Sequence, residues 1–480
     1  MNRAGIAARL ALRLIVLIGC LLLIQEPRLL VTPRDIQAGD SARQNGKVAE
    51  AIADYRAALE AQPNDLQLLT RLIESSLTVH RPDMATQYMR QVAAIQGWTP
   101  DLYRRMADVL VEQGDEQQAV IYWQTSLTGT AQDIPTLRKL ATYATTNQEW
   151  KDATEMLTRL IALAPNDDQA LYQLGLAVLP TDLQAGITYL GQAAADPEYR
   201  TASNAIQSTI IAHNKDNVAT LDFQIGLTLM TLKLWPYAEH ALSTALEHGQ
   251  NDPATLAFLG VTQDQQGRDG WPLIDQAFTL APNDPMVNYA SALHWRLAGD
   301  TDQALVSLNR AHTLDPKNPA IAAEIGLVYQ MLGRMDYAAQ WFTAASLLAP
   351  QNASFQTLLA TFYADTGYNL NGDGLPTIRK IADQFPNDAN VRASLGWALF
   401  TSDQYDAARV ELEKALILDP TNVRARYYFA VFLEKRGDPQ SAIEAFLYVY
   451  RDPADNAFKD LAAVALKRLG YSVDPNRTGS

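Results

Sequence analysis

The segment that decides the fold is residues 389–420, ANVRASLGWALFTSDQYDAARVELEKALILDP. Small and large apolar residues recur through it at the three- and four-residue spacing of a helix face: Leu395, Gly396, Ala408, Leu412 and Ala415. Small residues on such a face let two helices approach closely, and Pro420 ends the second one because proline cannot continue a helix. The segment therefore predicts two helices joined by a short turn.

The same pattern recurs along the chain with a period of 34 residues. Pro282, Pro316 and Pro350 lie 34 residues apart, and so do Pro386 and Pro420. Most of these prolines lead a turn that contains Asn or Asp. Because Asn and Asp favour turns and helix caps, each turn predicts one helix end and the next helix start. About twelve such units can be counted between residues 32 and 454.

This unit resembles the tetratricopeptide repeat (TPR) family, whose 34-residue repeats are helix–turn–helix hairpins. The resemblance implies an all-α fold, a right-handed TPR α-solenoid of about twelve repeats. With the two chain ends included, we predict five regions: a signal anchor or transmembrane segment in 1–31, a first TPR block of about five repeats in 32–197, an extra spacer helix in 198–216, a second TPR block of about seven repeats in 219–454, and a capping helix with a tail in 455–480.

The N-terminus predicts a membrane anchor. Nineteen mostly apolar residues run from Ile6 to Ile24, about the length of a membrane span, and no clear cleavage site follows. We expect a single-pass N-terminal helix with the bulk of the chain outside the cytoplasm, although Arg28 and Arg34 on the far side leave the cytoplasmic side open. A second interpretation is lipidation of Cys20, because the residues that precede it resemble a bacterial lipoprotein box.

Composition and motifs argue against several classes of function. The formal net charge is −14 and no basic stripe is present, which disfavours nucleic acid as a partner. The six histidines form no local ligand cluster, and no nucleotide-binding loop or nucleophile elbow occurs. We therefore expect no enzyme activity, metal, cofactor or small-molecule substrate. Residues 369–374 resemble part of a calcium loop, but Lys380 stands where its last acidic ligand belongs, so an enlarged turn is the simpler interpretation.

The candidate binding site is the inner face of the superhelix. Positions 2, 5, 9 and 12 of each first helix share the face opposite the second helix, and in the TPR family this face lines a groove. The stripe is polar in the repeats nearest the N-terminus and becomes apolar and aromatic from the fifth repeat. The candidate groove residues are Tyr172, Phe223, Met230, Met286, Tyr289, Arg296, Trp397, Phe400 and Tyr427. These residue types are enriched in protein-binding hot spots.

From these features we expect a membrane-tethered scaffold that binds protein or peptide partners through the groove. By analogy with the family, its setting is the assembly of a cell-envelope or secretion and export complex. An alternative is a non-catalytic regulatory subunit that holds an enzyme at the membrane. The stripe also has a second interpretation, which is packing against neighbouring repeats or against the extra helix in 198–216. The oligomeric state is open at this point.

Overall fold

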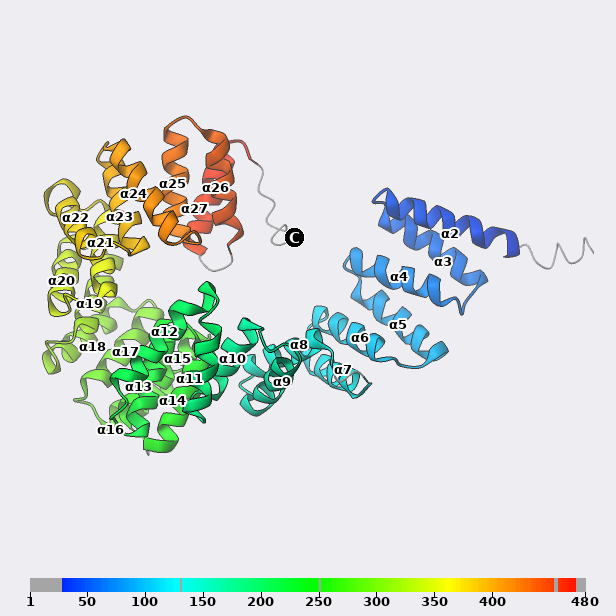
Figure 1. Ribbon diagram of the computed structural model, residues 1–480, viewed down its shortest axis with the longest axis horizontal. Coiled ribbons are helices and arrows are strands. Elements are labelled where there is room, and N and C mark those ends of the chain that lie inside the picture. The colour runs from blue at the N-terminus through cyan, green and yellow to red at the C-terminus, as the bar shows by residue number, and fades with distance from the viewer. Residues whose placement is uncertain (1–27, 130–131, 250–251, 453–455, 472–480) are drawn as a thin grey trace, which may run out of the picture. The chain divides into compact units, whose positions relative to one another are not determined.

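A computed structural model of the chain describes residues 28–129, 132–249, 252–452 and 456–471 (Figure 1). Within these ranges the regular structure is entirely helical, with 26 α-helices and one short π-helical turn. This confirms the predicted all-α helical-repeat solenoid. The helices follow one another in twelve pairs, and two helices, α12 and α27, stand outside the pairing.

The chain divides into two compact units. Unit 1 comprises the described residues up to Lys215 together with Thr231–Ala241, and unit 2 comprises Asp216–Met230 and the described residues from Leu242 onward.

Unit 1 contains five helix pairs and α12. Their bounds are α2 (Arg28–Gln44), α3 (Val48–Ala61), α4 (Leu66–Thr78), α5 (Pro82–Gln96), α6 (Pro100–Glu112), α7 (Glu116–Gly129), α8 (Ile134–Thr146), α9 (Trp150–Leu163), α10 (Asp168–Val178), α11 (Leu183–Ala193) and α12 (Pro197–Ala212).

The remaining helices begin with α13 (Val218–Thr231) and α14 (Trp235–Gly249), in which residues 231 and 235–241 group with unit 1. The others belong to unit 2: α15 (Pro253–Gln265), α16 (Trp271–Leu280), α17 (Pro285–Leu297), α18 (Thr301–Leu314), α19 (Pro319–Met331), α20 (Met335–Leu348), α21 (Ala353–Thr366), α22 (Leu375–Gln384), α23 (Ala389–Thr401), α24 (Tyr405–Leu418), α25 (Val423–Lys435), α26 (Pro439–Arg451) and α27 (Asn456–Arg468).

The hairpin that the sequence singled out shows why these residues form two helices. Asp388 caps α23, because its carboxylate accepts hydrogen bonds from the backbone N–H groups of Asn390 (2.9 Å) and Val391 (3.0 Å). At Gly396 the two helices approach so closely that a Cβ atom would lie 2.6 Å from Leu412 Cγ. The Leu412 side chain is fully buried in this contact. A glycine at this position is therefore a packing requirement of the hairpin.

The enlarged turn between α21 and α22 holds itself together. Asn369 has a left-handed backbone (φ 40°) and precedes the π-helical turn Leu370–Gly374. Its side-chain amide donates a hydrogen bond to Asp373 Oδ2 (2.8 Å), and Ser402 donates one to Asn371 Oδ1 (3.2 Å). The polar groups that resemble a calcium loop thus bond to one another or to the next repeat.

The predicted membrane segment falls almost entirely outside the described residues, which begin at Arg28; Cys20 is outside them as well. Within the described ranges, no helix has both the length and the apolar character that a membrane span requires.

Candidate protein-binding surface

Contacts between first helices locate the inner face of unit 2. On α25, Arg424 donates a hydrogen bond to Asp365 of α21 (2.5 Å), and Tyr428 donates another to the same carboxylate. The hairpin α23–α24 lies between these two helices in the sequence. First helices two repeats apart meet only on the side toward which a stack of hairpins curves. Asp365, Arg424 and Tyr428 therefore mark the inner face.

Three consecutive first helices line this face with a row of aromatic rings. Phe223 of α13 lies edge-on to Phe258 of α15, with ring centroids 5.8 Å apart, and Phe258 lies 6.0 Å from Tyr289 of α17. Such separations and tilts are favourable for aromatic pairs. Phe258 is buried, whereas Phe223 and Tyr289 are half-buried, as are Met230 and Met286, which pack on the same cluster. We call Phe223, Phe258 and Tyr289 the aromatic row.

An ion pair extends the row toward the next repeat. Arg296 of α17 donates a hydrogen bond from Nε to Glu324 of α19, whose side chain is almost fully buried. Burial raises the pKa of Glu324 above its usual value, and the neighbouring Arg296 guanidinium opposes that shift. Burial also raises the pKa of the nearby Tyr289 hydroxyl. The pair therefore places a compensated charge beside the aromatic row.

A second aromatic cluster lies on α23 and α25. Trp397 stacks on Phe400 (5.3 Å between centroids) and on Tyr428 (4.5 Å). The neighbouring Tyr427 points its ring at Phe458 of α27, 5.3 Å away, and the Arg424 guanidinium lies 5.1 Å from the same Phe458 ring. We call Trp397, Phe400, Tyr427 and Tyr428 the C-terminal cluster. Its rings are stabilised by one another and by α27, and the side chains of Trp397, Phe400 and Tyr427 remain half-buried.

One predicted groove residue, Tyr172, belongs to unit 1 and is in a different environment. Tyr172 of α10 stacks on Tyr199 of α12, with centroids 4.8 Å apart, and burial raises its pKa to about 12. At this position α12 covers the first helix α10. This agrees with the second interpretation of the stripe, in which its residues pack against the extra helix. The structure thus places seven of the nine predicted residues in these two clusters of unit 2. Arg296 pairs with Glu324 beside the aromatic row, and Tyr172 joins neither cluster.

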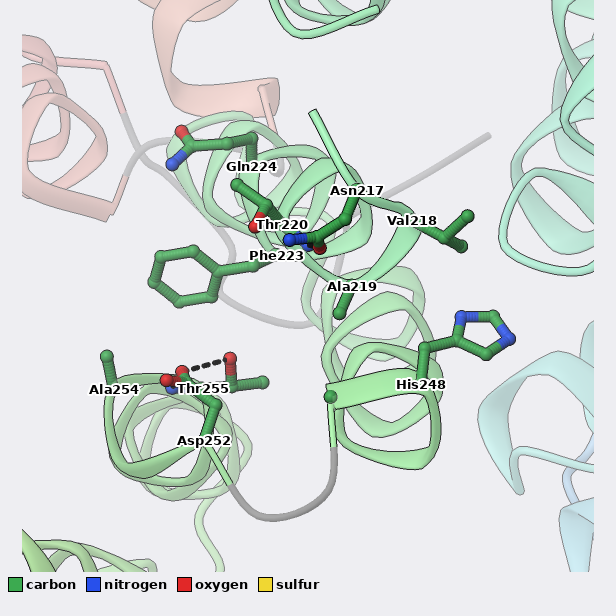
Figure 2. A pocket seen from close by; sticks show the side chains of 11 residues that line it. Asn217, Val218, Ala219, Thr220, Phe223, Gln224, His248, Asp252, Ala254 and Thr255 are labelled. Carbon is green, nitrogen blue, oxygen red and sulfur yellow. Dashed lines mark hydrogen bonds between the residues drawn. The ribbon is translucent and has the colours of Figure 1, made fainter. Parts of the chain in front are cut away.

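A cavity of about 730 Å³ continues the aromatic row at the start of unit 2 (Figure 2). Figure 2 shows Phe223 turned toward Ala254 and Thr255, in the first turn of α15, whereas His248 of α14 points the other way. Asp252 caps α15 by accepting hydrogen bonds from the backbone N–H and the hydroxyl of Thr255, at 2.8 and 2.7 Å. The cavity therefore presents one apolar ring beside a helix N-terminus whose cap is already satisfied.

The corresponding stripe of unit 1 is occupied by polar groups that bond to one another. Lys139 of α8 lies 2.6 Å from Asp108 of α6, and Asp108 also accepts a hydrogen bond from the Trp123 indole N–H (2.9 Å). Other pairs link neighbouring repeats in the same way: Arg71 with Asp40, Arg43 with Glu74, and Arg138 with Asp167, which caps α10. Part of the polar stripe predicted from the sequence is thus occupied by ion pairs between repeats.

Five residues of this surface lie outside the set predicted from the sequence: Phe258, Glu324, Asp365, Arg424 and Tyr428. Phe258, Glu324 and Tyr428 stand at position 6 of their helices, one residue beyond the predicted stripe. Arg424 stands at position 2 of its helix, which belongs to the predicted stripe, so it could have been identified from the sequence. Asp365 had no local signal, because its partners lie about sixty residues away. No cluster of three His, Cys, Asp or Glu side chains that could hold a metal ion occurs among the residues the structure describes.

The fold and this surface define a class of protein, a helical-repeat scaffold without a recognisable catalytic site in its described part. Three segments, residues 36–95, 296–361 and 399–465, match sequence profiles described as Tetratricopeptide repeat. These three segments are therefore tetratricopeptide repeats, and proteins built from such repeats are scaffolds for protein–protein interaction that are typically non-catalytic.

Several solved structures are similar to the chain at low sequence identity. Yeast Tom70 is 16% identical, with 93% of this chain and 96% of that chain covered and a TM-score of 0.41. A Pseudomonas aeruginosa pilF structure is 17% identical, with 45% of this chain and 99% of that chain covered and a TM-score of 0.36. MamA from Desulfovibrio magneticus is 20% identical, with coverages of 34% and 92% and a TM-score of 0.29. No curated protein matches the chain.

Proposed function

We propose that this protein is a scaffold that holds a partner polypeptide on the inner face of unit 2. The observation that supports this most directly is the aromatic row together with the C-terminal cluster. Both contain large rings that their own repeats leave half-buried. Rings of this kind gain stabilisation when a partner covers their remaining surface, and they lose little conformational entropy because they are already held in place.

The charges of the surface favour a polypeptide with mixed apolar and polar character. Glu324 is paired with Arg296, and Asp365 with Arg424, so the face carries little uncompensated charge. A strongly charged ligand would gain little there. An extended or helical segment can place apolar side chains on the rings and its polar groups beside the two ion pairs.

We further propose that the apolar run from Ile6 to Ile24 tethers the scaffold to a membrane, with the described repeats extracytoplasmic. The partner would then belong to a cell-envelope or secretion and export complex. Support for the tether comes from the length of the apolar run and the arginines that precede it. Support for the process is family analogy alone.

Crosslinking in intact membranes followed by affinity purification tests this proposal. The variant Tyr289→Ala/Trp397→Ala/Phe400→Ala is compared with wild type and with a matched control, Val306→Ala/Leu347→Ala/Ile417→Ala, whose side chains are exposed on the second helices α18, α20 and α24. Both variants are first checked for wild-type helicity and a cooperative melting transition.

We expect one set of partners to be lost from the groove variant and kept by the control. If a folded groove variant keeps every partner, the inner face is not the binding site. A single enzyme captured at fixed stoichiometry would favour the regulatory-subunit function. Recovery of the protein in the soluble fraction would contradict the tether without affecting the groove.

A further inference from the structure

The last helix of the chain, α27, has a second apolar face. Its inner face packs on the repeats before it through Phe458, Ala462, Ala465 and Leu466, all buried. Away from that face, Val464 is 66% exposed and Leu461 is 48% exposed. Helices that end a repeat stack normally carry a polar outer face, because no further repeat covers them. This one presents the kind of surface that a further helix would cover.

An acidic and a basic side chain lie along one edge of this apolar face, with the acidic one nearer the N-terminus of the helix. Asp460 and Lys467 are exposed and stand seven residues apart. A step of seven residues along a helix falls roughly 20° short of two full turns. The two side chains therefore lie along the same edge of the apolar face. Asp460 stands N-terminal to Val464 and Lys467 stands C-terminal to it. Within the described part of the chain neither side chain forms an ion pair, whereas Arg468 is bound to Glu434 (2.6 Å) and Lys459 lies over the Tyr450 ring.

We propose that a second copy of this chain docks on this face, with the two α27 helices antiparallel about a two-fold axis close to Val464. In a two-fold contact the same patch meets itself. The antiparallel arrangement brings Asp460 of each copy to Lys467 of the other, at both ends of the contact, and places the two Val464 side chains together at the centre. A parallel arrangement would instead place the two charged edges on opposite sides of the contact, where Asp460 and Lys467 of the two copies do not meet. The order of the charges therefore selects the antiparallel pair.

The expected dimer is weak. A 13-residue helix is roughly 20 Å long, so two such helices bury less than the ~1,200 Å² of a stable complex. Attachment of both copies to one membrane would raise their effective concentration and favour the dimer. Self-association should accordingly depend on concentration in solution. This proposal does not depend on the groove of unit 2, because it uses other residues.

Disulfide crosslinking of the full-length protein in a mild detergent tests the geometry. Cys20 is the only cysteine of the chain, so a Cys20→Ser background allows a single cysteine to be placed at will. We expect Val464→Cys to form a covalent dimer under mild oxidation and Ile417→Cys, which is also exposed on a helix of unit 2, to form little. Equal yields at the two positions would indicate random collision and would overturn the proposal.

Charge reversal tests the pairing. In sedimentation velocity experiments over a concentration series, Asp460→Lys and Lys467→Asp should each be shifted toward monomer, because each places like charges together at both ends. A mixture of the two variants should associate again, because each contact then joins opposite charges. Monomers at every concentration of the wild type, or no recovery in the mixture, would contradict the proposal. An increase in the Val464→Cys crosslink after deletion of residues 472–480 would show that this segment occupies the face instead.

Discussion

Units 1 and 2 are built from the same hairpin but present different inner faces. In unit 1, pairs such as Lys139 with Asp108 and Arg71 with Asp40 join neighbouring first helices through partly exposed charges. In unit 2, the same side of the hairpins carries the aromatic row, the C-terminal cluster and the buried Glu324. The hairpin core therefore sets the fold, and the inner positions are free to differ.

The difference has an energetic consequence. Ion pairs exposed to water contribute about 0–1 kcal/mol each, because water and salt screen them. Half-buried rings contribute more and still retain apolar surface that a partner can cover. The charged groups on the inner face of unit 1 are thus already paired with one another. The rings on the inner face of unit 2 can be stabilised further when a partner covers them.

The largest effect is expected from Trp397→Ala. Trp397 stacks on two rings and is half-buried, so its removal should destabilise unit 2 by about 2–3 kcal/mol. Thr142→Ala, at an exposed inner position of unit 1, should change stability by less than about 0.5 kcal/mol. Hydrogen exchange followed by mass spectrometry reports the protection of each unit separately. Equal losses in the two units would contradict the contrast.

Mild acid should weaken unit 1 more than unit 2. Burial lowers the pKa of His240, in the part of α14 that groups with unit 1, to about 4 from about 6.5 in the unfolded chain. Since the unfolded state takes up the proton first, the stability that neutral His240 provides is complete above pH 6.5 and is lost as the pH falls toward 4. The expected loss at pH 5 is about 2 kcal/mol.

In unit 2, the buried carboxyl group of Glu324 should affect stability in mild acid in the opposite direction. The pKa of Glu324 is raised by burial, so protonation is favoured in the folded state and costs no stability there. Hydrogen exchange at pH 7 and pH 5 measures the difference, after correction for the intrinsic exchange rate. The variant His240→Phe, whose ring can still stack on Trp150, should remove the acid sensitivity of unit 1. An unchanged pH dependence in this variant would assign the effect to other groups.

A smaller effect is expected from breaking one ion pair in each unit. Glu324→Ala leaves the half-buried Arg296 without its carboxylate and should cost about 1–2 kcal/mol. Glu74→Ala breaks the exposed pair with Arg43 and should cost less than about 0.5 kcal/mol. Urea unfolding curves of the two variants compare them directly. The contrast would fail if Glu74→Ala were the more damaging change.

The fold was predictable because its determinants are local. The spacing of Leu395, Gly396 and Leu412 within one repeat predicts a close-packed hairpin, and the structure shows that hairpin with a fully buried Leu412. The inner surface was predictable only in part. Phe258 and Tyr428 lie one position beyond the predicted stripe, since the inner face spans more of the first helix than four positions at ideal helical spacing.

Two further features have no local signal in the sequence. Asp365 meets Tyr428 because the curvature of several stacked hairpins brings them together, and that curvature is a sum of small packing angles. Tyr172 is covered because α12 packs where a regular repeat would not. Both depend on contacts between elements far apart in the chain, which helical periodicity does not encode.

The central claim is that the inner face of unit 2, and not that of unit 1, binds a partner polypeptide. Site-specific photocrosslinking in living cells tests it most directly, with p-benzoylphenylalanine placed at Tyr289 or Phe400 in unit 2 and at Thr70 or Thr142 in unit 1. We expect a covalent adduct with the same partner from both unit 2 positions and none from the unit 1 positions. Adducts from Thr70 and Thr142, with none from Tyr289 and Phe400, would contradict it.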